Sequence, residues 1–299
     1  MHQNNIRASM RVALGAGLGL AALLGPAVTP AHAVNLVPNP SFEAYSSCPD
    51  FLSEMDRAVP WDIPTTGGSS DYYNVCAPGA SLVSVPNNSF GTQAPRTGDG
   101  YAGLIVRPIN DYREYITVPL NAPLTASTTY TVEFWLSLVD LSNQSIDRMG
   151  AYLSVGPVGP VPGAPTLPYT PQVESPANVF LSDKTNWMQV TGSYTATGGE
   201  SYITIGNFHD NATTNVSALG AGSYSDTYYY VDDVSVTAEP GGPTLEACCL
   251  GSTGSCTMLE PGECTLVGGT PLGPGTICDN VPCLPVPTKG ASDRSRGTP

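Results

Sequence analysis

The stretch YYYVDDVSV, residues 228–236, decides the fold class of this chain. It is rich in aromatic and β-branched residues, which are typical of β-strands. Successive side chains of a strand point to opposite faces, so Asp232 and Asp233 are expected to point opposite ways. One of the two carboxylates should then share the face of the apolar residues. A buried, unpaired carboxylate costs several kcal/mol, so another part of the sequence must supply its partner.

Residues 34–238 predict an all-β domain around this strand. Val, Thr, Tyr and Ser are the commonest residues, and Gly, Pro and Asn separate the segments they form. No long stretch repeats its apolar residues at the spacing of a helix. Several short strands divided by turn signals indicate an antiparallel β-sandwich or jelly roll. The Pro/Gly-rich segment 155–176 is predicted to be a long surface loop. Strands are predicted at 101–106, 112–118, 129–139, 149–155, 187–195, 201–208 and 227–237.

Residues 1–33 are predicted to be a secretory signal peptide. Arg7 and Arg11 precede an apolar run at 12–24, and the small residues of Ala31-His32-Ala33 favour cleavage before Val34. The apolar run is too short for a membrane span. Without this leader the chain has 9 basic and 25 acidic residues, a net charge of −16. We therefore expect a secreted, extracellular or cell-surface protein that neither inserts into membranes nor binds nucleic acid.

Eight cysteines in an exported chain predict disulfides. Cys48 and Cys76 lie in the first domain and are expected to bond to each other, because pairing with the others would leave an odd count. After a linker at 239–246, residues 247–285 form a cysteine-rich module, and residues 286–299 are predicted to be a disordered tail. The six cysteines of the module allow 15 pairings, which the sequence does not resolve. They are Cys248, Cys249, Cys256, Cys264, Cys278 and Cys283.

The sequence offers little for acid–base or zinc chemistry. His209 is the one histidine beyond the leader, and no nucleophile-elbow pattern lies near it. The cysteines lack paired C-x-x-C knuckles, so a zinc site is not expected. We interpret His209 as a loop histidine near a strand end.

The segment NLVPNPSFE, residues 35–43, supplies a candidate partner for the two aspartates. If the first and last strands of the domain are neighbours, Glu43 and the inward-facing aspartate meet at one edge of the core. Two carboxylates there repel each other unless a cation joins them. Calcium prefers such oxygen ligands, so Glu43, Asp232 and Asp233 predict a structural Ca²⁺ site. The alternative is that backbone N–H groups hold the aspartates, or that they lie exposed at a twisted edge.

The two terminal segments, NLVPNPSFE and YYYVDDVSV, resemble the paired terminal strands of galactose-binding-like jelly rolls, the fold of many carbohydrate-binding modules. SDYYNVC, VPNNSFGTQAPRTGDGYAGL and TNWMQVTGSYTATGGESYITIGNF resemble more narrowly a family of bacterial secreted and cell-surface domains. The resemblance covers about residues 34–238 and implies a structural calcium ion and, by analogy, glycan binding. It supplies no established ligand or catalytic residue. The C-terminal unit resembles short cysteine-rich modules of secreted proteins from environmental bacteria, which supply no activity.

Candidate ligand-binding residues come from two loops and from the side-chain alternation of two strands. The disulfide loop supplies Trp61, Tyr72, Tyr73 and Asn74, and the segment 85–103 supplies Asn88 and Gln93. In TVEFWLSLV, residues 131–139, the alternating apolar side chains are predicted to face the core. Glu133 and Trp135 then lie on the opposite face of the strand. The same argument points Arg113 and Tyr115 away from the core. Aromatic faces and polar groups of these kinds bind sugars, but large aromatic residues are also mostly buried. The candidates are Trp61, Tyr72, Tyr73, Asn74, Asn88, Gln93, Arg113, Tyr115, Glu133 and Trp135.

Three functions compete on this reading. The first is a secreted, non-catalytic module that recognises a neutral glycan on a calcium-stabilised β-sandwich. The second is a structural or adhesive cell-surface protein that binds protein or matrix. The third is a glycan-active hydrolase or lyase, which would need two opposed carboxylates, with Glu114 and Glu133 as the pair to test.

Overall fold

The computed structural model describes residues 34–220, 222–239, 245–250, 254–273, 276, 278 and 283. The predicted signal peptide, residues 1–33, and the predicted tail, residues 286–299, lie outside the described residues. Within the described part of the chain, no helix has the length and apolar character needed to cross a membrane.

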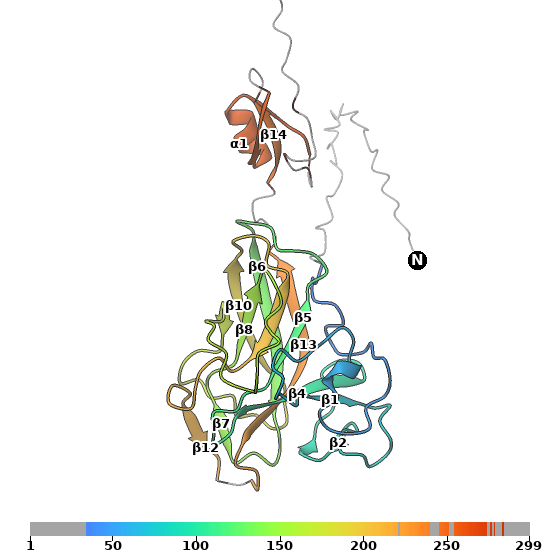
Figure 1. Cartoon of the computed structure of the whole chain (residues 1–299). Helices are drawn as coiled ribbons and strands as arrows, with labels where there is room; N and C mark the ends of the chain where they lie inside the picture. The colour runs from blue at the N-terminus through green and yellow to red at the C-terminus, as the bar shows by residue number, and fades with distance from the viewer. Residues whose placement is uncertain are drawn as a thin grey trace, which may run out of the picture. The chain divides into compact units, whose positions relative to one another are not determined.

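Two antiparallel sheets pack face to face and form the sandwich predicted from the sequence (Figure 1). Each of the seven predicted strands overlaps a strand of these sheets. The five-stranded sheet has the order β1 (Asp71–Asn74), β4 (Gly100–Arg107), β13 (Thr227–Ala238), β6 (Thr129–Leu138) and β10 (Met188–Thr195). The four-stranded sheet has the order β5 (Tyr115–Pro119), β11 (Tyr202–Gly206), β8 (Gly150–Ser154) and β9 (Val173–Glu174).

The elements that the sequence did not predict are short. β1 is one of them, and all four of its residues are buried, so it shows no alternation of polar and apolar positions. The remaining short elements are the 3₁₀ helix η1 (Met55–Arg57) and the strands β2 (Asn87–Asn88), β3 (Gly91–Thr92), β7 (Gln144–Ile146), β9, and β12 (Val216–Ala218).

The core lies between the two sheets, and β6 shows how the sequence specifies it. Its burial alternates along the strand, with Val132, Phe134 and Leu136 fully buried in the core cluster. Glu133 and Trp135 lie on the opposite face and are partly exposed. The predicted assignment of the two faces of this strand is confirmed.

A β-bulge in β13 changes the outcome for the two aspartates. The pairing of β13 with β6 shifts register between Asp232 and Ser235, and Asp233 has a φ of 46°, in the left-handed region. Because one residue is inserted, Val231 and Val234 both face the core. The expectation that one aspartate shares the face of the apolar residues is therefore wrong. Asp232 is buried on the outer face, opposite Trp135.

The two distant ends of the sandwich lie side by side, as the sequence predicted. The Leu36 N–H donates to the Val236 carbonyl at 2.9 Å, and the Val234 N–H donates to the Pro40 carbonyl at 3.0 Å. The Asn35 side chain adds a bond to the Val234 carbonyl at 3.0 Å. These bonds join residues about 200 positions apart in the chain, so they close the sandwich.

The segment 155–176 is a loop except for the two residues of β9, and the part before β9 does more than run over the surface. It lies on the outer face of the four-stranded sheet, where Val158 and Leu167 are buried with Tyr115 and Phe208. The rings of Tyr152 and Tyr169 stack with centroids 4.6 Å apart. Backbone bonds tie the loop to residues 64–67, so it has a fixed path across the sheet.

All eight cysteines are paired. Cys48 bonds to Cys76, as predicted. The described part of the C-terminal module is a sheet of β15 (Ser255–Leu259), β14 (Glu246–Leu250) and β16 (Gly269–Pro271), with the helix α1 (Pro261–Leu266) between β15 and β16. β14 thus begins at the end of the predicted linker. The three bridges of the module are Cys248–Cys264, Cys249–Cys283 and Cys256–Cys278.

Candidate functional site

Most of the predicted ligand-binding side chains belong to the interior. The expectation that they contact a ligand is corrected, because their side chains are buried: those from the disulfide loop and Gln93 pack inside the domain, and a loop covers the outer face on which alternation placed Arg113 and Tyr115. The Trp61 Nε1–H donates to the Asn39 carbonyl at 2.9 Å, and the Tyr72 hydroxyl donates to the Phe42 carbonyl at 2.8 Å. The seven buried candidates are Trp61, Tyr72, Tyr73, Asn74, Gln93, Arg113 and Tyr115.

Arg113 is the clearest of these corrections. Its side chain has no exposed surface. The guanidinium donates twice to the His209 carbonyl, at 3.1 and 2.9 Å, and once to Asn211 Oδ1 at 2.9 Å. Burial lowers the pKa of the guanidinium. Arg113 therefore ties the start of β5 to the loop at 209–211 instead of facing a ligand.

Trp135 and Glu133 stay on the partly exposed outer face of β6. The Arg96 guanidinium lies 3.7 Å above the Trp135 ring, in a cation–π contact. An ion pair with Asp233 holds the Arg96 side chain in that place. Glu133 accepts a bond from the Gln189 side chain at 2.8 Å. The predicted sugar platform is thus covered on one face by Arg96, a residue whose role the sequence did not show.

Asn88 is the third candidate that is not buried. Its amide group donates to the Tyr101 hydroxyl at 3.1 Å and accepts from the Tyr230 hydroxyl at 2.6 Å. Its amide oxygen also accepts from the Phe90 N–H at 2.9 Å. These bonds fix the loop at 87–91 on the sheet, so Asn88 serves the packing of that loop.

The three carboxylates predicted to bind calcium all contact one loop, residues 96–100. Asp232 accepts from the Arg96 N–H at 2.8 Å, and Glu43 accepts from the Asp99 and Gly100 N–H groups at 2.8 and 3.1 Å. Asp233 accepts from Ser41 and Thr97 hydroxyls at 2.6 and 2.5 Å. Burial, and then the charge of Asp233, raise the pKa of Asp232 to about 8.

This arrangement answers the question of how the outer-face carboxylate is held. Backbone N–H groups hold Asp232, as the first alternative to calcium states, whereas hydroxyls and a guanidinium hold Asp233. Among the described residues, no group of three or more His, Cys, Asp or Glu side chains is placed to hold a metal ion. In this structure the three carboxylates accept hydrogen bonds from protein donors. Calcium binding by these residues remains a prediction.

His209 belongs to a surface ion-pair cluster. Its Nε2 lies 2.7 Å from Glu174 Oε1, and Arg148 binds the other oxygen of Glu174 at 2.9 Å. Among the described residues, the His209 ring makes no hydrogen bond to a Ser, Thr or Cys side chain. Glu174 therefore fixes the His209 ring at the loop, and no nucleophilic side chain of the described residues is bonded to it.

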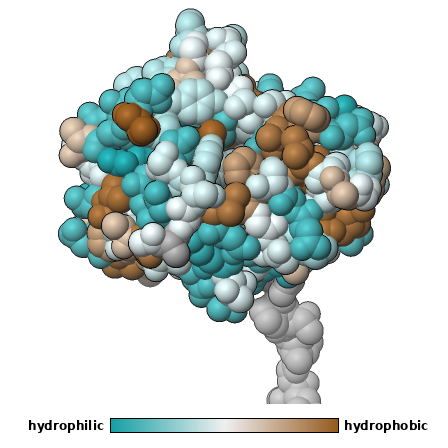
Figure 2. Space-filling model, turned by 90° about the horizontal axis from the view of Figure 1, so that it is seen from below, coloured by the Kyte–Doolittle hydropathy of each residue, from teal (hydrophilic) through white to brown (hydrophobic). Residues whose placement is uncertain are grey.

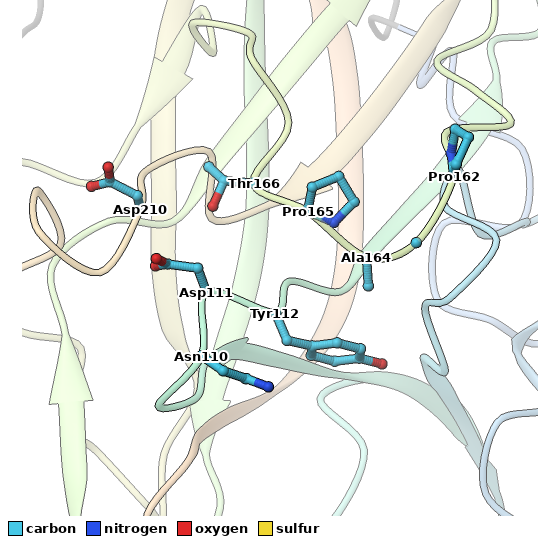
Figure 3. Close-up of a pocket in the computed structure, with 9 residues that line it drawn as sticks. Asn110, Asp111, Tyr112, Pro162, Ala164, Pro165, Thr166 and Asp210 are labelled. Carbon is cyan, nitrogen blue, oxygen red and sulfur yellow. The ribbon is translucent and has the colours of Figure 1, made fainter.

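An open pocket lies on one side of the 155–176 loop (Figure 3). Its carboxylates, Asp111 and Asp210, both accept bonds from the loop at 210–213: Asp111 from the Asn211 N–H at 2.6 Å, and Asp210 from the Thr213 N–H at 2.9 Å. Bonds from Thr213 lower the pKa of Asp210. The pocket has a volume of about 560 Å³ and is lined by Asn110, Asp111, Tyr112, Pro162, Gly163, Ala164, Pro165, Thr166 and Asp210.

A second, more enclosed depression lies on the other side of this loop, and we call it the Tyr202 cleft. It lies at the β5–β11 edge of the four-stranded sheet and has a volume of about 480 Å³. Its walls are mostly proline rings, while Tyr202 supplies an aromatic ring and Asp62 the one charged side chain. Asp62 Oδ1 accepts from the Ile63 N–H at 2.7 Å. The lining residues are Pro60, Asp62, Ile63, Pro64, Thr117, Pro119, Pro157, Val158, Gly159, Pro160 and Tyr202.

The face drawn in Figure 2 carries its apolar residues in separate spots divided by hydrophilic ones. Exposed apolar residues scattered in this way are normal for a protein surface, whereas a broad continuous patch would mark a partner. That face therefore gives no sign of a large apolar interface.

Comparisons with known proteins add the following. No family model and no curated protein matches this chain. The K1 cleaved adhesin domain of Lys-gingipain from Porphyromonas gingivalis W83 is similar with a TM-score of 0.35 and 14% identity, over 67% of this chain and 96% of that one. The CBM22-1 xylan-binding domain of Paenibacillus barcinonensis Xyn10C has a TM-score of 0.35 and 10% identity, over 70% and 97%. Likenesses this low carry no argument about the ligand of this chain.

Proposed function

We propose that this chain is an exported, non-catalytic module that binds a neutral glycan in the Tyr202 cleft. The observation that carries the proposal is the pairing, in one cleft, of the Tyr202 ring with the Asp62 carboxylate. Ligand sites are concave, mostly apolar and carry a few polar groups, and the cleft has that composition. Its volume of about 480 Å³ lies within the range of about 300–1,000 Å³ that is usual for such sites.

The chemistry of the cleft favours a sugar over a charged ligand. An aromatic face packs on the C–H patches of a sugar ring, and a carboxylate accepts hydrogen bonds from its hydroxyls. Prolines have a fixed φ, so their rings form walls that need little ordering when a ligand enters. The chain carries 25 acidic and 11 basic residues, which disfavours polyanions and leaves neutral glycans.

Replacing Tyr202 by alanine should weaken binding of neutral oligosaccharides by roughly tenfold or more, a loss of about 1.4 kcal/mol or more. The measurement is calorimetric titration with xylo-, gluco-, manno- and galacto-oligosaccharides. Tyr45→Ala is the matched control, because the Tyr45 side chain is 42% exposed and lies outside the cleft. Equal losses in both variants, or no binding of any sugar by the wild-type chain, would contradict the proposal.

The adhesive function is the alternative, and one pair of experiments separates it. A glycan array without hits, together with a pull-down that yields one protein, would favour a protein-binding module.

For the enzymatic alternative, Glu114 is buried and accepts bonds from Ser69, Tyr112 and Ile105, while Glu133 lies on the outer face of β6. Release of reducing sugar that disappears in Glu133→Gln would overturn the non-catalytic assignment.

We also propose, from the sequence, that calcium stabilises the sandwich. Glu43, Asp232 and Asp233 contact one loop, which supports a shared location for the three carboxylates. Removing calcium with a chelator should lower the melting temperature by several degrees, corresponding to roughly 1 to 3 kcal/mol of linkage. An unchanged melting temperature would show that the N–H, hydroxyl and guanidinium donors hold these carboxylates without an ion.

A further inference from the structure

Three of the four sheet edges in the sandwich are short or covered. β1 has four residues, and on its free side the Asn74 N–H donates to the Val83 carbonyl at 3.4 Å. The free side of β5 is bridged by Asp62, whose N–H and carbonyl both bond to Thr117 at 2.9 Å. β9 has only two residues. Covering or shortening an edge removes the row of unpaired backbone groups that would pair with another chain.

The fourth edge, β10, is long, and its free backbone groups are not covered by hydrogen bonds in the described part of the chain, although Val173 of β9 packs on the inner side of Gly192. It runs for eight residues, MQVTGSYT, and pairs with β6 in a continuous register from Met188 to Thr195, without a bulge. It contains no proline and no charged residue. Among the described residues, no backbone hydrogen bond joins β10 to any strand other than β6. Figure 1 shows β10 at the border of its sheet.

We propose that this edge pairs with the same edge of a second copy of the chain. β10 of one copy would lie antiparallel to β10 of the other, so that two five-stranded sheets join into one ten-stranded sheet about a two-fold axis. Extended backbone is the ligand that an open strand edge accepts, and it supplies main-chain N–H and C=O groups in register. Isologous two-fold pairing is the commonest way in which identical chains associate.

The side chains of β10 suit self-pairing. With Gly192 on the axis, Thr191 would lie opposite Ser193 on the outer face, and Val190 opposite Tyr194 on the inner face. Hydroxyl pairs and aromatic–β-branched pairs both stabilise antiparallel strands. Gly192 brings no side chain to the axis, where the two copies approach most closely.

The β10 edge adds no charge that would oppose a second copy. The chain is acidic, with a net charge of −14, so two copies repel across most of their surface. β10 itself is uncharged, and the carboxylates nearest to it accept bonds from its own side chains: Glu133 from Gln189 at 2.8 Å, and Glu239 from Ser193 at 2.5 Å. These bonds hold the two carboxylates in place on their own chain, and the strand that would meet the second copy adds no charge.

The test is the mass of the full oxidised chain in solution, measured by light scattering and sedimentation over a concentration series. The wild-type chain should move from the monomer to the dimer mass as concentration rises. Thr191→Lys should weaken the dimer by roughly tenfold or more, because it places two ammonium groups near the axis. The matched control is Thr237→Lys, which adds the same charge to the outer face of β13, two strands from the edge.

Hydrogen exchange gives a second readout that does not depend on a variant. The β10 amides that point away from β6 should exchange more slowly at high than at low protein concentration. A wild-type chain that stays monomeric at every concentration would overturn the proposal. A dimer that Thr191→Lys leaves intact would place the interface elsewhere and would also overturn the proposal. The same holds if Thr237→Lys weakens the dimer as much as Thr191→Lys does. Capture of an extended peptide by a monomeric chain would assign the edge to another partner.

Discussion

Replacing Arg113 by methionine should lower the free energy of unfolding by about 3 to 5 kcal/mol. Methionine fills much of the same volume but donates no hydrogen bonds. The His209 carbonyl and Asn211 Oδ1 would then lose their buried donors, and unsatisfied buried groups are costly. The loop at 209–211 would also lose its main tie to β5.

Urea denaturation followed by tryptophan fluorescence measures this loss, because the three tryptophans, Trp61, Trp135 and Trp187, all lie in the sandwich. Arg148→Met is the matched control. The Arg148 side chain is 23% exposed and pairs with Glu174, so its loss should cost about 1 kcal/mol or less. Equal losses for the two variants would contradict the role assigned to Arg113.

The stability of the sandwich should fall as pH rises from about 4 to about 7, and Asp71 should cause part of that fall. Burial, and then the nearby charge of Glu114, raise the pKa of Asp71 from its ordinary value of 3.8 to about 7. Below pH 3.8 both the folded and the unfolded chain carry the proton, and the contribution of this group is fully present. Between the two pKa values only the folded chain holds the proton, so stability is lost as pH rises, by up to about 1.4 kcal/mol per pH unit.

Asp71→Asn tests this origin of the pH dependence. Asparagine resembles the protonated acid: Oδ1 can accept from the Ser53 N–H, and Nδ2 can donate to the Tyr228 hydroxyl. The variant should gain stability relative to the wild-type chain as pH rises through this window, reaching a few kcal/mol at pH 8. Urea midpoints at a series of pH values measure the difference.

Other buried carboxylates limit the effect of Asp71→Asn, and an exposed one supplies its control. The pKa values of Asp232 and Glu114 are also raised by burial, so a smaller fall with pH should remain in Asp71→Asn. Asp210→Asn is the control, because the Asp210 carboxylate is exposed and its pKa is lowered by Thr213. A pH profile that Asp71→Asn leaves unchanged would show that Asp71 titrates in its ordinary range.

The site was predicted less well than the fold, and Tyr115 shows why. Alternation along β5 correctly placed Tyr115 away from the core of the sandwich. The 155–176 loop then buries that outer face, and the Tyr115 hydroxyl accepts from the Leu167 N–H at 3.0 Å. Arg96 shows the opposite error, because its contacts with Trp135 and Asp233 join residues 39 and 137 positions away. No local pattern in the sequence marks such a contact.

Local sequence determined which segments form strands, which face of β6 meets the core, and that Cys48 bonds to Cys76. The resemblance of the segments ending in Glu43 and beginning at Tyr228 to paired terminal strands predicted that they lie together, and the structure confirms it. Only the tertiary structure decided which outer faces the loops cover, and that a bulge at Asp233 turns both aspartates away from the core. The physical reason is that strand alternation is a property of neighbouring residues, whereas burial of an outer face depends on loops distant in the chain.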